Sequence, residues 1–218
     1  MPDILDEVDD MMRQERATKF WHENGKYIIA FVVMTIVFTA AISAYRTWNQ
    51  SVQESQTAAI LMAVEDQSFP DNITDLAKDL RPNLRGIALL NGASAYMQAE
   101  KQTEAAALYT QLADDKSIPD DLRSLGTLMS VRLSNDTIST DDKLAKLTAL
   151  SKQKNDVWQP YGLLEKALIL ANEQQDTPAA LAALNDLLQI ENLPPSLQAN
   201  AENLHHLYSI DVMKMEQK

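Results

Sequence analysis

Residues 83–115 read NLRGIALLNGASAYMQAEKQTEAAALYTQLADD, and this stretch decides the fold. Small or apolar residues recur at helical spacing on both sides of a polar turn at residues 100–102. They are Leu89, Gly92, Ala93 and Tyr96 before the turn and Ala105, Leu108, Tyr109 and Leu112 after it. Residues three and four apart share one face of a helix. We therefore expect an antiparallel helix hairpin, with Gly92 at a packing position rather than in a β-turn.

The same spacing occurs twice more along the chain. The second unit would pair Leu122, Leu125, Gly126 and Met129 with Leu144, Leu147 and Leu150, and the third would pair Leu164, Ala167, Leu168 and Ala171 with Ala180, Ala183, Leu184 and Leu187. The distance between front helices brackets the period of about 34 residues that is typical of tetratricopeptide repeats. The extra residues of the second unit are best placed in a loop at residues 135–140.

Composition agrees with a helical fold. Five glycines and eight prolines in 218 residues are few for the many tight turns of a β-sandwich or barrel. No segment alternates polar and apolar residues as a half-buried strand would. Residues 51–66 should form a helix that ends at Phe69-Pro70-Asp71, and residues 72–82 should form a short helix and turn. The fold class expected is all-α.

An uncharged stretch near the N-terminus predicts a membrane span. YIIAFVVMTIVFTAAISAY, residues 27–45, holds nineteen residues without a charge. As a helix it would extend roughly 27 Å, close to the hydrocarbon core of about 30 Å. Trp21 and Tyr27 lie near one end and Tyr45 and Trp48 near the other, where aromatic rings favour the headgroup layer. One transmembrane helix is expected.

Basic residues near the span predict its orientation. Arg13, Arg16, Lys19 and Lys26 precede it, and only Arg46 follows within about twenty residues. This asymmetry places the N-terminus in the cytoplasm and residues after Tyr45 on the other side of the membrane. A cleavable signal peptide, cut near Ser43-Ala44, is the alternative. The long acidic leader and the long apolar stretch favour a retained anchor, so Met1 or Pro2 should begin the mature protein.

The segment before the span has its own helical pattern. Ile4, Val8 and Met11 recur between acidic residues, so a short amphipathic helix is expected there. It would either dock on a partner or simply lead into the span. The expected organisation is a cytoplasmic acidic stub (1–26), a transmembrane helix (27–45), a connecting helix and turn (46–82) and a repeat domain (83–218).

Several short motifs resemble a known family. Ala95-Tyr96, Glu104-Ala105, Tyr109 and Leu125-Gly126 are similar to tetratricopeptide repeat positions. KFWHENGK at residues 19–26, the single span, Trp158-Gln159-Pro160 and Leu193-Pro194-Pro195 follow one another as in the YfgM-like family of tetratricopeptide proteins. The resemblance implies an α-solenoid of about three tetratricopeptide-like hairpins. It also implies a single-pass bacterial inner-membrane protein that faces the periplasm and associates with the Sec translocon and periplasmic chaperones.

The sequence offers little for catalysis or for cofactors. It contains no cysteine, no P-loop and no GxGxxG, HExxH or GxSxG motif. His205 and His206 are adjacent on an expected helix, so their side chains diverge and cannot chelate one metal ion. The pairs Asp120-Asp121 and Asp141-Asp142 precede apolar segments, where carboxylates cap helices and meet the positive end of the dipole. No enzyme activity, cofactor or metal is expected.

Partner binding is the function that this leaves. Repeat helices form extended binding surfaces, and on a tetratricopeptide register the groove of the first unit would be formed by Ile87, Leu90, Ser94, Met97 and Gln98. The corresponding set in the second unit is Asp120, Arg123, Thr127, Ser130 and Val131. Alternatively, the helix at residues 51–66 packs over Ile87, Leu90 and Met97 and closes the groove.

We therefore expect a membrane-anchored periplasmic scaffold that binds proteins near the Sec translocon and assists exported polypeptides. Its partners would be translocon subunits, chaperones or exported chains, together with the lipid bilayer. A net charge of −12, from 31 acidic and 19 basic residues, argues against nucleic acid. No small-molecule substrate is expected. The alternative is an assembly subunit that holds an inner-membrane complex together through a permanent interface.

Overall fold

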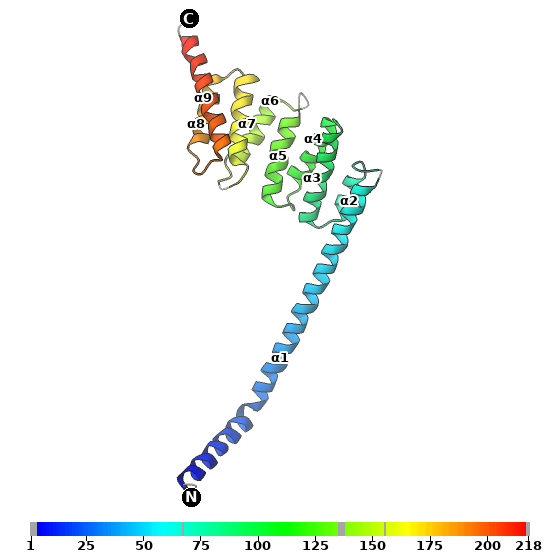
Figure 1. Ribbon diagram of the computed structural model, residues 1–218, viewed down its shortest axis with the longest axis vertical. Helices are drawn as coiled ribbons and strands as arrows, with labels where there is room; N and C mark the ends of the chain where they lie inside the picture. The colour runs from blue at the N-terminus through cyan, green and yellow to red at the C-terminus, as the bar shows by residue number, and fades with distance from the viewer. Residues whose placement is uncertain (1–3, 67, 135–137, 155, 217–218) are drawn as a thin grey trace. The chain divides into compact units, whose positions relative to one another are not determined.

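The computed structural model describes residues 4–66, 68–134, 138–154 and 156–216 (Figure 1). Within these ranges the regular elements are helices and no strand occurs, so the expected all-α fold is confirmed. The helices are α1 (Ile4–Glu65), α2 (Ile73–Asp79), α3 (Pro82–Gln98), α4 (Gln102–Asp114), α5 (Asp120–Leu133), α6 (Thr140–Ser151), α7 (Gln159–Asn172), α8 (Thr177–Leu188) and α9 (Pro195–Glu216). The chain divides into two compact units, residues 1–55 and residues 56–218.

The first unit is the long N-terminal part of α1. The portion from Met12 to Glu65 contains an 18-residue window with a mean hydropathy of 2.3 and is long and apolar enough to cross a membrane. None of that window is buried by the rest of the protein. The Thr35 and Thr39 hydroxyls donate to backbone carbonyl oxygens four residues earlier, at 2.8 Å each, so these polar groups are satisfied inside the helix.

The second unit is a right-to-left succession of antiparallel helices in Figure 1, in which each helix from α2 to α9 packs on the next along the chain. Buried residues of α2, α3 and α4 form one core cluster, to which Ile60 of α1 also belongs. Residues of α7, α8 and α9 form a second cluster, and Leu128, Val131, Leu147, Leu150 and Ile169 form a third between them. The unit therefore also contains residues 56–82, which were predicted to form a connecting segment.

The expected hairpin of α3 and α4 is present. Leu89, Ala93, Ala105 and Leu112 are buried at 3% exposure or less, in the stripes that the helical spacing predicts. The turn between the helices places Glu100 in the left-handed region, with φ 59°. The Lys101 amide donates to the Tyr96 carbonyl there at 2.9 Å, which closes the end of α3.

Two glycines allow close approaches of different kinds between helices. A Cβ at Gly92 would lie 2.6 Å from Cγ2 of Ile73, which confirms Gly92 as a packing position between α3 and α2. A Cβ at Gly126 would lie 2.9 Å from two backbone atoms of α4, the Tyr109 oxygen and the Ala113 nitrogen. Helices α4 and α5 therefore touch through their backbones at Gly126.

The helix caps differ from the sequence-based expectation. Helix α5 begins after Pro119 with no side-chain cap, and Asp120 and Asp121 lie in its first turn, where the helix dipole favours them. At α6 the cap is Ser139, whose hydroxyl oxygen accepts from the Asp142 amide at 3.1 Å. Capping by these aspartate pairs was thus wrong, because Pro119 and Ser139 occupy the two cap positions.

Two expectations concern residues whose placement is not described. The loop insertion at residues 135–140 includes residues 135–137, which lie outside the described residues. For the N-terminal stub, the helix backbone begins at Ile4, while the side chains of Ile4, Val8 and Met11 are not described.

Candidate protein-interaction surface

The five residues of the expected groove separate into two groups on α3. Ile87, Ser94 and Gln98 are exposed, and the exposed fraction of Ile87 is 44%. Leu90 and Met97 are half-buried and pack against the core cluster that contains Ile60 of α1. One edge of the α3 surface is thus part of the core, and the other edge faces solvent. As partner-binding residues, all five stay a prediction.

The corresponding surface of α5 is not an open wall. Ser130 and Val131 are buried at 0% and 2% exposure, and Val131 belongs to the core cluster with Leu147 and Leu150 of α6 and Ile169 of α7. Asp120 remains exposed and forms an ion pair with Arg123 at 2.6 Å. The expected position of Ser130 and Val131 in a groove is therefore wrong.

A cleft that the sequence alone does not predict lies between α2 and α4, with α3 at its base. This α2–α4 cleft has a volume of about 500 Å³ and is lined by Thr74, Ala77, Lys78, Arg85, Leu89, Thr110, Gln111, Asp114 and Asp115. Ala77 and Leu89 are buried apolar residues, and the remaining lining residues are polar or charged. The sequence pattern that could have revealed the cleft is the apolar pair Ile73 and Ala77, four residues apart. Both side chains are buried, so α2 packs as a helix of the repeat unit.

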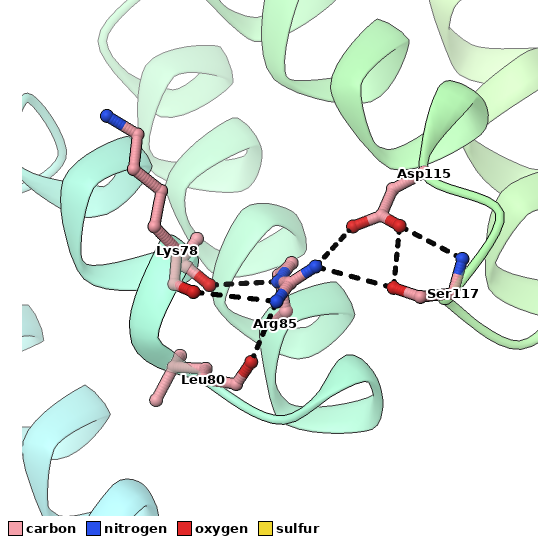
Figure 2. A network of polar contacts seen from close by, with 6 residues as sticks. Lys78, Leu80, Arg85, Asp115 and Ser117 are labelled. Carbon is pink, nitrogen blue, oxygen red and sulfur yellow. Dashed lines mark hydrogen bonds and ion pairs between the residues drawn. The ribbon is translucent and has the colours of Figure 1, made fainter.

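Arg85 organises one end of the cleft (Figure 2). Its Nε donates to the Ala77 carbonyl oxygen at 3.0 Å, and Nη2 donates to the Leu80 carbonyl oxygen at 3.1 Å. Nη1 forms an ion pair with the Asp115 carboxylate at 2.7 Å. The guanidinium thus neutralises the negative end of α2 and fastens it to the residue that follows α4.

Asp115 is held in its charged form. The Ser117 hydroxyl and amide donate to its Oδ1 at 2.6 and 2.9 Å. The hydrogen bond from the Ser117 hydroxyl, followed by that from Arg85, lowers the pKa of Asp115 to about 2. The Arg85–Asp115 pair is therefore charged at any pH above the acid range.

A second pocket lies between the loops that precede α7 and α9. It has a volume of about 490 Å³, and its lining includes Gln159, Pro160, Leu193 and Pro194. These residues come from the two motifs, Trp158-Gln159-Pro160 and Leu193-Pro194-Pro195, that carry part of the family resemblance. Val157, at the rim, is 70% exposed. The two motifs thus form one surface feature.

The described residues show no cluster suited to metal binding. No three side chains of His, Cys, Asp or Glu within that part of the chain converge on one point. His205 and His206 lie side by side on α9. Of the charged residues described above, Arg85 and Asp115 form an ion pair that joins two parts of the fold, whereas Asp120 and Arg123 pair within α5.

Comparison with known proteins gives one match. The family profile described as tetratricopeptide repeat-like domain matches residues 18–159. The matched region runs from α1 to the first residue of α7 and includes both the apolar stretch and the α2–α4 cleft. Searches of curated proteins and of solved structures found no match.

Proposed function

Since the chain belongs to the tetratricopeptide repeat-like family, we propose that it is a membrane-anchored periplasmic scaffold that binds partner proteins near the Sec translocon. Tetratricopeptide-like domains bind other proteins through the surfaces of stacked helices. The resemblance to the YfgM-like family supports translocon subunits, periplasmic chaperones and exported chains as the partners. As part of this proposal, the protein has no enzyme activity of its own.

The observation that carries this proposal is that α1 contains two different parts, an apolar stretch of membrane-spanning length and a residue of the repeat unit's core. This one helix contains the apolar stretch, whose side chains are exposed, and also Ile60, which is buried in the core of the repeat unit at 6% exposure. Exposed fractions of 70% for Phe31 and 69% for Met34 are costly in water and favourable in lipid. Helix α1 thus contains both the apolar stretch and a residue of the repeat unit's core.

Anchoring supplies the mechanism. Two partners confined to one membrane meet at an effective concentration of about millimolar when the linkers are short. Weak contacts in the clefts and on the exposed edge of α3 are then sufficient for binding. Weak contacts also suit a scaffold that must release an exported chain. The basic residues before the span, compared with Arg46 after it, support a cytoplasmic N-terminus and a periplasmic repeat unit.

A permanent assembly subunit is the second candidate. It is favoured by Leu61 and Met62 of α1, which are 62% and 72% exposed although they lie within the repeat unit. Adjacent exposed apolar side chains of this size mark interfaces in many proteins. An assembly subunit would co-purify with its complex in a fixed ratio, whereas a scaffold would capture several partners in variable amounts.

The experiment that separates the two candidates is crosslinking in intact cells. A photoreactive amino acid is placed at Ser94, on the exposed edge of α3, and the products are identified by mass spectrometry. A matched chain carries it at Met62. The scaffold proposal expects translocon subunits, chaperones or exported chains from Ser94. Capture of one fixed membrane complex from Met62, with none from Ser94, would contradict it and support the assembly subunit.

A further inference from the structure

We propose that the α2–α4 cleft is a subsite for a lysine or arginine side chain of the bound polypeptide. This inference rests on the proposed function, because it names the chemistry that the scaffold would recognise in a partner.

Three of the four charged residues of the cleft are already paired. Lys78 forms an ion pair with Asp75 at 2.7 Å, and Arg85 forms one with Asp115, also at 2.7 Å. Asp114 lines the same cleft, and in the described part of the chain no side chain or backbone group pairs with its carboxylate. The unpaired charge in the cleft is therefore the negative charge of Asp114.

The position of Asp114 strengthens this negative field. It is the last residue of α4, a helix with no basic residue in its final turn. The carbonyl groups at a helix C-terminus carry a partial negative charge, which a cation stabilises. An aspartate at this position is unfavourable for the helix itself. A cationic side chain from a partner would offset both the Asp114 charge and the helix end.

Arg85 is not available to bind an anionic ligand in this cleft. Figure 2 shows its guanidinium surrounded by acceptors from the protein, and Nε, Nη1 and Nη2 all donate within the fold. The contacts are to the carbonyl oxygens of Ala77, Lys78 and Leu80, to the Asp115 carboxylate and to the Ser117 hydroxyl. A carboxylate ligand would have to displace these partners. The cleft therefore favours a cation.

The shape of the cleft suits a long basic side chain. Buried Ala77 and Leu89 provide an apolar floor for the methylene groups, and Asp114 provides the counter-charge. The exposed amide of Gln111 can bond to the backbone of an extended segment. A volume of about 500 Å³ holds such a side chain together with its neighbouring backbone.

The test uses the full chain in dodecyl maltoside micelles and two short peptides, Ac-Gly-Lys-Gly-NH2 and the same peptide with Nε-acetyl-lysine. Saturation-transfer NMR reports which ligand protons contact the protein. We expect signals from the lysine δ and ε methylene protons, and much weaker ones from the acetylated peptide. Equal signals from both peptides would overturn the proposal, because acetylation removes only the charge and adds apolar surface.

Two charge-reversal variants localise the binding. Asp114→Lys should weaken binding of the lysine peptide about tenfold. Asp186→Lys makes the same change in net charge in the last turn of α8, outside the cleft, and should leave binding within about twofold. Lysine at the end of α4 should leave the melting temperature equal or higher, because it suits the helix dipole. Retained binding in Asp114→Lys, or equal loss in both variants, would contradict the proposal.

Crosslinking from Ser94 keeps the two proposals distinguishable. If the lysine peptide fails to bind while the partner crosslinks persist in cells, the cleft proposal is wrong and the scaffold proposal stands. If the lysine peptide binds but no partner is captured, the scaffold proposal is wrong and the cleft proposal stands.

Discussion

At the scale of single residues, Gly126 is the glycine at which an added methyl group would meet backbone atoms of another helix. An added methyl group would lie 2.9 Å from backbone atoms of Tyr109 and Ala113. Backbone atoms cannot rotate away, so α4 and α5 must separate. We expect Gly126→Ala to lower the free energy of unfolding by about 1 to 3 kcal/mol, although alanine gains up to about 1 kcal/mol of helix propensity. Urea denaturation of the full chain in micelles measures this change.

Gly162 provides the matched control. A methyl group there would meet Cδ2 of Leu150 at 2.9 Å, and the end of a leucine side chain can move. We expect Gly162→Ala to cost clearly less than Gly126→Ala in the same urea experiment. Equal denaturation midpoints for the two variants would show that the backbone contact between α4 and α5 is not as close as described.

We expect Asp115 to make the free energy of unfolding depend on pH in the acid range. Its pKa falls to about 2 in the folded protein from an ordinary value of 3.8. A lowered pKa means that the charged form stabilises the fold above about pH 4, and that this contribution is lost as the pH falls from about 4 to about 2. The difference in unfolding free energy between the wild type and Asp115→Asn should shrink across that window. A difference that stays constant from pH 5 to pH 2 would show that the ion pair does not act in this way.

At the scale of elements, the facing stripes of α3 and α4 make the sharpest prediction. Ala105 is fully buried between the two helices, while Ser94 is exposed on α3. Ala105→Glu would bury an unpaired carboxylate and overfill the joint, and a small domain has only about 5 to 15 kcal/mol of stability. The variant should lose most of its cooperative melting transition. Circular dichroism recorded during heating measures this loss.

Ser94→Glu is the control for this change. It adds the same charge to the helical surface, so melting should stay nearly unchanged while crosslinks to partners weaken. Identical melting temperatures for the two variants would mean that the helix register is wrong. Retained crosslinks in Ser94→Glu would place the partner surface elsewhere on the repeat unit.

The elements also show how far the sequence could predict the structure. Helical spacing located the hairpin of α3 and α4 and the pairing of α7 with α8, because their apolar stripes are short and regular. It failed for the surface of α5, where Ser130 is buried although serine is usually exposed. Contacts between residues distant in sequence decide which side of a helix is covered by a neighbouring helix. The periodicity of one helix carries no information about these contacts. The α2–α4 cleft was missed for the same reason.

At the scale of the whole molecule, the predicted order of parts agrees with one long apolar helix followed by stacked hairpins. Composition and spacing were sufficient to predict this order. The thickness of a bilayer sets the length of an apolar helix that can cross it, and a pair of helices sets the period of a repeat. The choice of partner was beyond such reasoning. It depends on a few charges, such as Asp114, whose importance follows from the pairing of Arg85 with Asp115. A linear sequence does not indicate which aspartate is already paired.

The claim on which the function depends is that α1 anchors an exported repeat unit. Alkaline phosphatase, which is active only after export, fused after Lys218 measures this directly, with a fluorescent protein that folds only in the cytoplasm as the reciprocal fusion. We expect an active phosphatase and a dark fluorescent fusion, because four basic residues precede the span and one follows it closely. Moving the basic residues to the far side of the span should reverse both signals. A fluorescent fusion and an inactive phosphatase in the unaltered chain would contradict the claim.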